Sequence, residues 1–317
     1  MKRKKRNYRA FLFFLLFISM LLIIYIKFNK TEASLSTIDY KKDSYLTYVY
    51  SSEKLPYNLT YRLIDFYANL EILHNKYSYA VKDYSEINSS LQTFLSWSRQ
   101  TKFLNTIIKG KENDSVALDT FCIVSWLYND TSSVKHLIPY ITPENNLMAD
   151  NYYAQSDHWR NIADETWCVM LIKESNFNST LADELLKIKL SEGTAFLKND
   201  TYAESDKAAV IIHELLLLNE FPSSHSQDKI YWLSKASEYI NKEEISPNTL
   251  LIANLLNVMI NYNSSKESIS PYITILEKRK RKDNYWLPYE TASPDNGQIF
   301  TTSRVLITLR HYKQKYT

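Results

Sequence analysis

The amino-acid sequence predicts an all-helical protein, an α/α toroid preceded by one membrane-spanning helix. Three observations predict this fold. Apolar residues recur with a helical period through nearly the whole chain after residue 57. Segments that are apolar all round alternate with segments that carry one apolar stripe, as an inner and an outer ring of helices would require. Only three glycines occur, Gly110, Gly193 and Gly297, whereas the tight hairpins of β-proteins favour glycine.

The N-terminus carries the clearest local signal. Six basic residues within residues 1–10 precede an apolar run over residues 11–28, and such a run is just long enough to span a bilayer. The basic flank is expected to stay in the cytoplasm, so the rest of the chain is predicted to be extracytoplasmic. Cleavage near Thr31 to Ala33, as in a secretory signal peptide, is the alternative. The expected organisation is therefore a cytoplasmic tail (1–10), a transmembrane signal anchor (11–28), a linker (29–50) and one extracytoplasmic domain (51–317).

The periodicity of this domain predicts eleven helices, near residues 57–79, 84–99, 115–128, 131–141, 161–174, 179–197, 205–219, 227–241, 247–262, 271–281 and 300–313. Some starts carry capping signals. Ser246-Pro247 and Ser270-Pro271 place a hydroxyl before a proline at the first helical position. Thr180 with Asp183 resembles a capping box.

The distribution of apolar residues predicts how these helices pack. Residues 208–218 and 250–260 are apolar almost all round, so they are expected to be buried on every side. Their neighbours are one-sided, as in the stripe of Trp232, Ala236 and Tyr239. An α-solenoid of paired helices is the alternative, although no strict repeat of roughly 34 or 40 residues is visible.

Composition excludes several function classes. Outside the basic tail the chain carries 32 Lys and Arg against 35 Asp and Glu, a net charge of −3, which disfavours a nucleic-acid partner. A P-loop or a dinucleotide fingerprint needs more closely spaced glycines than this chain has. We expect no cofactor. The basic run at residues 278–282 is interpreted as a helix C-terminus, with a polyanion or lipid patch as the alternative.

Two cysteines, Cys122 and Cys168, each lie in an apolar run. They are either buried thiols or a disulfide, which an extracytoplasmic location permits. No His-Glu-x-x-His motif or cysteine pair with zinc-ligand spacing is present, so no metal site is expected.

Three loop segments carry residues suited to chemistry on sugars. Glu53 precedes an apolar turn with Tyr57, where a raised pKa would make its carboxyl a proton donor; a solvated glutamate near the helix start is the alternative. The second segment, residues 150–167, alternates aromatic and acidic side chains. Sugar rings stack on aromatic rings while carboxylates accept their hydroxyl groups, so the substrate-binding candidates here are Tyr152, Tyr153, Asp157 and Trp159; packing onto the core is the alternative.

The third segment, residues 283–297, is a long non-periodic loop, and such loops are often functional. Its acids include Asp295, and its Trp286 is a further substrate-binding candidate. Glycoside hydrolysis requires two carboxyl groups, one that protonates the leaving oxygen and one that activates water or attacks directly. The sequence supplies such carboxyl groups but not their separation.

These residues resemble the family 8 glycoside hydrolases. Ser52-Glu53 and Tyr57 match the acid motif of that family, with Leu59 in place of its methionine and its three glycines replaced. Ser205-Asp206 opens a buried helix as a second family motif does, and Pro288-Tyr289 with Asp295 echoes a third. The resemblance implies an (α/α)6 barrel and a β-linked polysaccharide substrate.

The same resemblance gives each acid a role. Glu53 would be the proton donor, Asp206 a residue at the central sugar subsite and Asp295 the base. Residues 299–306 also look like helix starts in terpene-cyclase toroids, which bears on the fold alone because no Asp-rich isoprenoid motif is present.

The sequence therefore leads to two expectations about function. The first is a membrane-anchored glycoside hydrolase-like protein that acts on an envelope or secreted polysaccharide. The second is a non-catalytic envelope protein that binds a glycan or a protein through the same cleft, because the family's glycines and two of its acids are replaced.

Overall fold

The computed structural model describes residues 17–21, 60–81, 83–100, 115–137, 166–176, 179–221, 225–294 and 297–317. These residues are helical and contain no strand, which confirms the all-α prediction. The principal helices are α3 (Tyr61–Tyr77), α4 (Tyr84–Gln100), α6 (Ser115–Leu127), α7 (Thr131–Leu137), α10 (Thr166–Glu174), α11 (Ser179–Leu197), α12 (Glu204–Asn219), α13 (Ser226–Tyr239), α14 (Thr249–Asn261), α15 (Lys266–Lys278) and α16 (Gln298–Tyr316). Each overlaps one of the eleven helices expected from the periodicity.

The predicted membrane anchor lies mostly outside the described residues. Residues 17–21 within it are helical, and the side chains of Phe17 and Met20 are exposed. Across the described ranges, none of the helices combines the length and the apolar character that crossing a bilayer requires.

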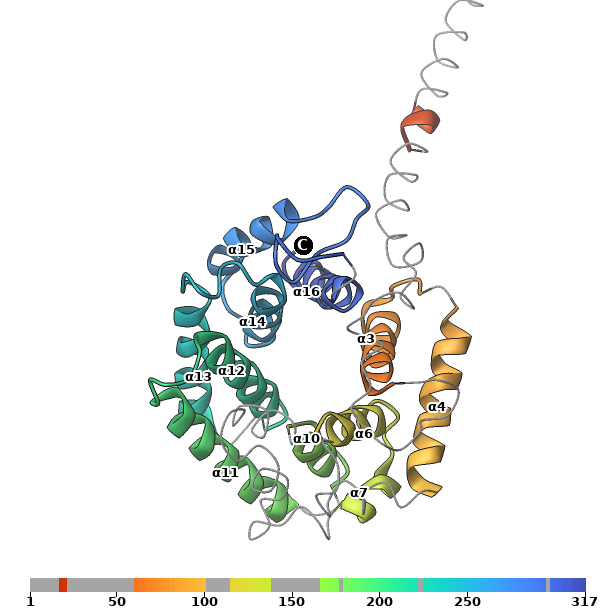
Figure 1. Ribbon diagram of the computed structural model, residues 1–317, viewed down its shortest axis with the longest axis vertical. Coiled ribbons are helices and arrows are strands. Elements are labelled where there is room, and N and C mark those ends of the chain that lie inside the picture. Colours follow the sequence, from red (N-terminus) through yellow and green to blue (C-terminus); the bar gives the residue numbers. More distant parts are fainter. Residues whose placement is uncertain are drawn as a thin grey trace, which may run out of the picture.

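Six helices contact one another in a closed cycle, in the order α3, α6, α10, α12, α14, α16 and back to α3. Figure 1 shows these six around the centre of the molecule, and we call them the inner ring. Helices α4, α7, α11, α13 and α15 lie outside the ring, and each of them packs against at least one inner helix. Helices therefore alternate between an inner and an outer position along the sequence.

Neighbouring inner helices run in the same direction where hydrogen bonds connect them. From α16, Thr308 donates to the carbonyl oxygen of Ala253 at 2.9 Å, His311 pairs with Asn257 at 2.9 Å, and Lys315 donates to the carbonyl of Ile260. Because both partners advance together along the chain, α14 and α16 are parallel. The N-termini of these helices consequently lie at the same end of the ring.

Burial separates the inner from the outer helices as the apolar pattern predicts. In α12 the buried side chains lie on all sides of the helix. In α13 the buried side chains form a single stripe of Trp232, Ala236 and Tyr239. Helices α14 and α15 differ in the same way. The core thus fills the layer between the two sets of helices, where each inner helix buries its outward face.

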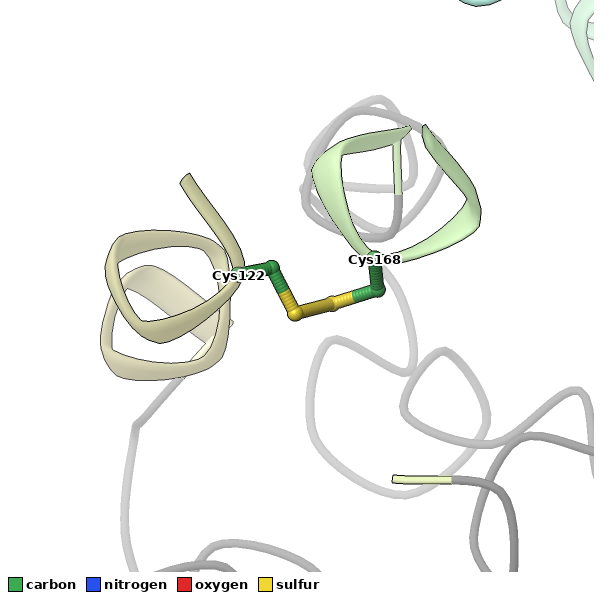
Figure 2. Close-up of a disulfide and its surroundings, with 2 residues drawn as sticks. All are labelled: Cys122 and Cys168. Atoms are coloured by element: carbon green, nitrogen blue, oxygen red, sulfur yellow. A yellow bond between two sulfur atoms is a disulfide. The ribbon is translucent and has the colours of Figure 1, made fainter. Parts of the chain in front are cut away.

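Cys122 and Cys168 form a disulfide, with their Cα atoms 4.9 Å apart. Figure 2 shows that the bond joins α6 to α10, two adjacent helices of the inner ring. Of the two alternatives that the sequence leaves open, the disulfide is the one found.

Two of the predicted helix starts are wrong. Helix α14 begins one residue after Asn248, whose side-chain oxygen accepts the amide of Leu251, so Ser246 is not the cap. Helix α15 begins after Ser265, which accepts the amide of Ser268, and Pro271 therefore lies inside the helix. The cap at Ser265 precedes the Ser-Pro signal, and extending the helix back to it buries Ile269.

The capping box expected at Thr180 is not formed. Helix α11 begins at Ser179, so Thr180 is already helical, and the carboxylate of Asp183 accepts from Lys173 at 3.2 Å. The basic run at residues 278–282 is a helix C-terminus as expected, because α15 ends at Lys278.

Candidate functional site

A cavity of about 260 Å³ lies on the axis of the inner ring, and side chains from all six inner helices line it. We call it the axial cavity. Its lining includes the last turns of α3, α12 and α14, through Lys76, Asn219 and Asn261. The axial cavity therefore extends from the middle of the ring toward the end where these inner helices finish.

One wall of the axial cavity is aromatic and the opposite wall is rich in amides. The rings of Trp126 on α6 and Trp167 on α10 lie 5.3 Å apart between centroids, at an interplanar angle of 55°. Across the ring, α14 contributes Asn254, Asn257 and Asn261. An aromatic surface facing several hydrogen-bonding amides is a typical arrangement for a polar ligand with apolar faces.

The middle of the axial cavity carries His213 from α12 and Arg304 from α16. Burial and, to a smaller extent, the positive charge of Arg304 together lower the pKa of His213 to about 4. The imidazole is consequently neutral at pH 7. On α3, burial raises the pKa of Asp65, while Arg304 and Arg62 act in the opposite direction.

Two carboxyl groups mark the rim. Desolvation raises the pKa of Glu174 at the end of α10, and the neighbouring Glu220 carboxylate raises it further by repulsion. Glu220 itself lines the axial cavity. Glu71 on α3 is buried, and its Oε1 accepts from the side chains of Asn75 at 2.7 Å and Tyr84 at 2.8 Å.

Several polar atoms of the lining residues are buried without a hydrogen-bond partner in the protein. They include Oε2 of Glu71, Nδ1 of His213 and Nε of Arg304. The carboxylate oxygen can only accept a hydrogen bond and the guanidinium N–H can only donate one, while the imidazole nitrogen does either according to its tautomer. Because unpaired buried polar groups are costly, these atoms favour a ligand that both donates and accepts hydrogen bonds.

Among the residues predicted to act on a substrate, Asp206 and Trp286 are the two that the structure describes. Asp206 lies in the first turn of α12, partly exposed, and does not line the axial cavity. It precedes His213 by seven residues, about 10 Å along the helix axis. It therefore lies toward the opposite end of the ring from the cavity rim.

Trp286 packs in the core. Its side chain is 2% exposed, and its indole N–H donates to the carbonyl oxygen of Leu276 at 2.6 Å. Its backbone N–H donates to Oγ1 of Thr302 at 3.0 Å. A ring placed in this way anchors the loop after α15 and has no open face for a sugar. The other predicted site residues lie outside the described residues: Glu53, Tyr57, Tyr152, Tyr153, Asp157, Trp159 and Asp295.

The sequence contains a pattern that indicates the axial cavity, but it lies in the helices and not in the three loop segments from which the site was predicted. Polar residues interrupt the most apolar helices: His213 in α12, Asn254 and Asn257 in α14, and Arg304 in α16. A polar side chain on a helix that is buried all round must face another polar group or a cavity. Polar residues within otherwise buried helices are therefore the sequence pattern that indicates the cavity lining.

Comparison with known proteins identifies no relatives, because no protein-family model, curated protein or solved structure matches this chain. Within the described ranges, no group of three or more His, Cys, Asp or Glu side chains is placed to hold a metal ion.

Proposed function

We propose that this chain is an α/α toroid that binds a glycan of the cell envelope in its axial cavity. The supporting observation is the lining of the cavity: two indole rings tilted against each other on one side, amides on the other, and buried donors and acceptors without partners between them. Sugars present hydroxyl groups that both donate and accept, together with C–H faces that pack on aromatic rings.

The alternation of inner and outer helices supports the toroid part of this proposal. A closed cycle of contacts among six inner helices is the arrangement of an (α/α)6 barrel, whereas a solenoid has two open ends. The final inner helix, α16, packs against the first, α3, so the cycle has no free end among the described helices.

The disulfide supports an extracytoplasmic location. Structural disulfides persist in oxidising compartments and are rare in the cytosol, and the one between Cys122 and Cys168 joins two core helices. Together with the basic and apolar N-terminal segments, it favours a single-pass membrane protein with its C-terminal domain outside the cell.

The binding proposal is tested with the full chain, purified in a detergent that has no sugar headgroup, on an array of neutral, acidic and amino glycans. The proposal predicts binding to a subset of the array, with competition by the free glycan. Replacing Trp126 with Ala should weaken this binding, since it removes half of the aromatic wall, and Ile230→Ala on the exposed side of α13 is the matched control. Absence of binding to every glycan would refute the proposal.

Glycoside hydrolysis is the second candidate function, and the position of Asp206 favours it. This acid lies at the first turn of an inner helix, which is where the family 8 resemblance requires its counterpart. Hydrolysis predicts release of reducing ends from a bound polysaccharide, lost in both Asp206→Asn and Glu53→Gln. Binding without release in the native chain would leave the binding function and exclude the catalytic one.

A further inference from the structure

Arg304 carries a positive charge inside the axial cavity. Its Nε is buried without a hydrogen-bond partner. Its guanidinium carbon lies 5.4 Å from the centroid of the Phe300 ring on the same helix. The guanidinium forms no ion pair with any described residue. A half-buried guanidinium with its Nε shielded from water is stabilised by a counter-charge and by hydrogen bonds in its plane.

The charges around Arg304 do not cancel it. Asp65 is the acid that interacts with it electrostatically, and the same carboxyl group also interacts with Arg62 on its own helix, so one acid is shared by two cations. His213 faces Arg304 and is neutral. On the rim, Lys76 adds another positive charge and Glu220 a negative one.

Glu71 is a further acid in the lining, and its own helix and a neighbouring one satisfy it in part. Asn75 and the hydroxyl of Tyr84 both donate to its Oε1. Glu220 follows the last residue of α12, whereas Glu71, His213 and Arg304 lie within their helices. The lining therefore carries one acid at the rim, and an acid and a cation farther inside.

We propose that the axial cavity recognises an acidic sugar, with an oxyanion of the ligand paired to the Arg304 guanidinium and hydrogen-bonded by His213. This inference rests on the proposed glycan-binding function and names its ligand class. A carboxylate or a phosphate supplies two oxygen atoms that match the donors of a guanidinium. A hydroxyl group of the same sugar can donate to Glu71, whose Oε2 is buried without a hydrogen-bond partner. The cavity volume suits one or two sugar units, since it lies just below the range of about 300–1,000 Å³ common for ligand pockets.

Matched pairs of ligands test the inference without any change to the protein. Cellobiuronic acid and cellobiose differ by a carboxylate in place of a hydroxymethyl group, and glucose 6-phosphate and glucose differ by the phosphate. Isothermal titration of the full chain should show the acidic member of at least one pair bound about tenfold to a hundredfold more tightly, the range of a charge-assisted hydrogen-bond pair. The pair that shows the preference identifies the oxyanion.

Variants then assign the preference to Arg304. Arg304→Gln should bring the acidic and neutral members to nearly equal affinity, while Arg304→Lys retains part of the preference. Lys278→Gln removes one positive charge from an exposed position and should leave the preference unchanged. Far-ultraviolet circular dichroism and the melting temperature of each variant establish that it is folded.

The outcomes separate this inference from the proposal beneath it. Equal affinity for acidic and neutral members in the native chain, or no binding of any of the four sugars, overturns the acidic-sugar inference even if other glycans bind on the array. An array without a single bound glycan overturns the glycan-binding function itself. If Arg304→Gln still binds the acidic sugar more tightly than the neutral one, a cation other than Arg304 binds the acidic group and the inference is wrong.

Discussion

Replacing Glu214 with Gln is expected to remove a loss of stability that the Glu214 carboxyl group causes as pH rises from 5 to 8. Glu214 lies on the outward face of α12 and is 2% exposed, and neither of its carboxyl oxygens has a hydrogen-bond partner. Burial raises its pKa to about 8, against attraction by Lys189, and Glu192 adds repulsion. The carboxyl group is therefore protonated in the folded protein at neutral pH.

The sign and size of the effect follow from this pKa. The unfolded chain loses the proton near pH 4.5 and the folded protein near pH 8, so the folded state binds more protons between these values. The contribution of Glu214 to the free energy of unfolding consequently falls as pH rises through this window and levels off above it. At about 1.4 kcal/mol per pKa unit, the loss is at most about 5 kcal/mol.

Urea denaturation of the full chain at pH 5, 7 and 9 measures this loss. Glutamine resembles the protonated acid and cannot ionise, so Glu214→Gln should match the native protein at pH 5 and exceed its stability at pH 9. Glu184→Gln on the exposed face of α11 is the control, because it removes an acid from a solvated position. The reasoning is wrong if the difference in stability between Glu214→Gln and the native protein is the same at pH 5 and pH 9, or if Glu184→Gln shows an equal change in this difference.

Three further changes test the packing. An alanine at Gly193 would place its Cβ 2.6 Å from Oε1 of Glu214. The resulting overpacking should destabilise the folded protein by about 1–3 kcal/mol, which outweighs the gain in helix propensity. Adding Glu214→Ala removes the contact, so Gly193→Ala should then raise the urea midpoint instead of lowering it. Replacing Cys122 and Cys168 with Ser removes a disulfide between residues 46 positions apart in the sequence. The free energy of unfolding should fall by about 4 kcal/mol, which calorimetry measures. An unchanged melting temperature would contradict this. Thr302→Val leaves a buried backbone amide unpaired and should cost about 1–3 kcal/mol in urea denaturation; a neutral result would mean that this hydrogen bond is replaced.

The helices could be predicted because their signal is local. Continuous apolar faces at a period of 3.6 residues set the position of every described helix, and the contrast between α12 and α13 indicated which helix lies inside. Helix starts were less certain, because two capping signals compete within a few residues. At α15 the earlier one, Ser265, prevails and leaves Pro271 inside the helix.

The candidate site could not be predicted in the same way. The axial cavity exists only when six helices from residue 61 to residue 316 close on one another, and no local pattern reports which polar side chains then meet. Trp286 illustrates the difficulty, since an aromatic residue in a polar loop suggested a sugar-binding surface, but its ring is buried and hydrogen-bonded. The partner of a loop residue is set by tertiary packing.

The most direct test of the account is to fill the axial cavity and measure glycan binding by calorimetry. Asn254 lines the cavity from the middle of α14, and Asn254→Trp would occupy much of its volume while Ile230→Trp adds the same ring on the exposed side of α13. The account predicts that a glycan bound by the native chain is lost in Asn254→Trp and retained in Ile230→Trp. Unchanged affinity in a folded Asn254→Trp protein would show that glycans bind elsewhere and that the axial cavity is not the site.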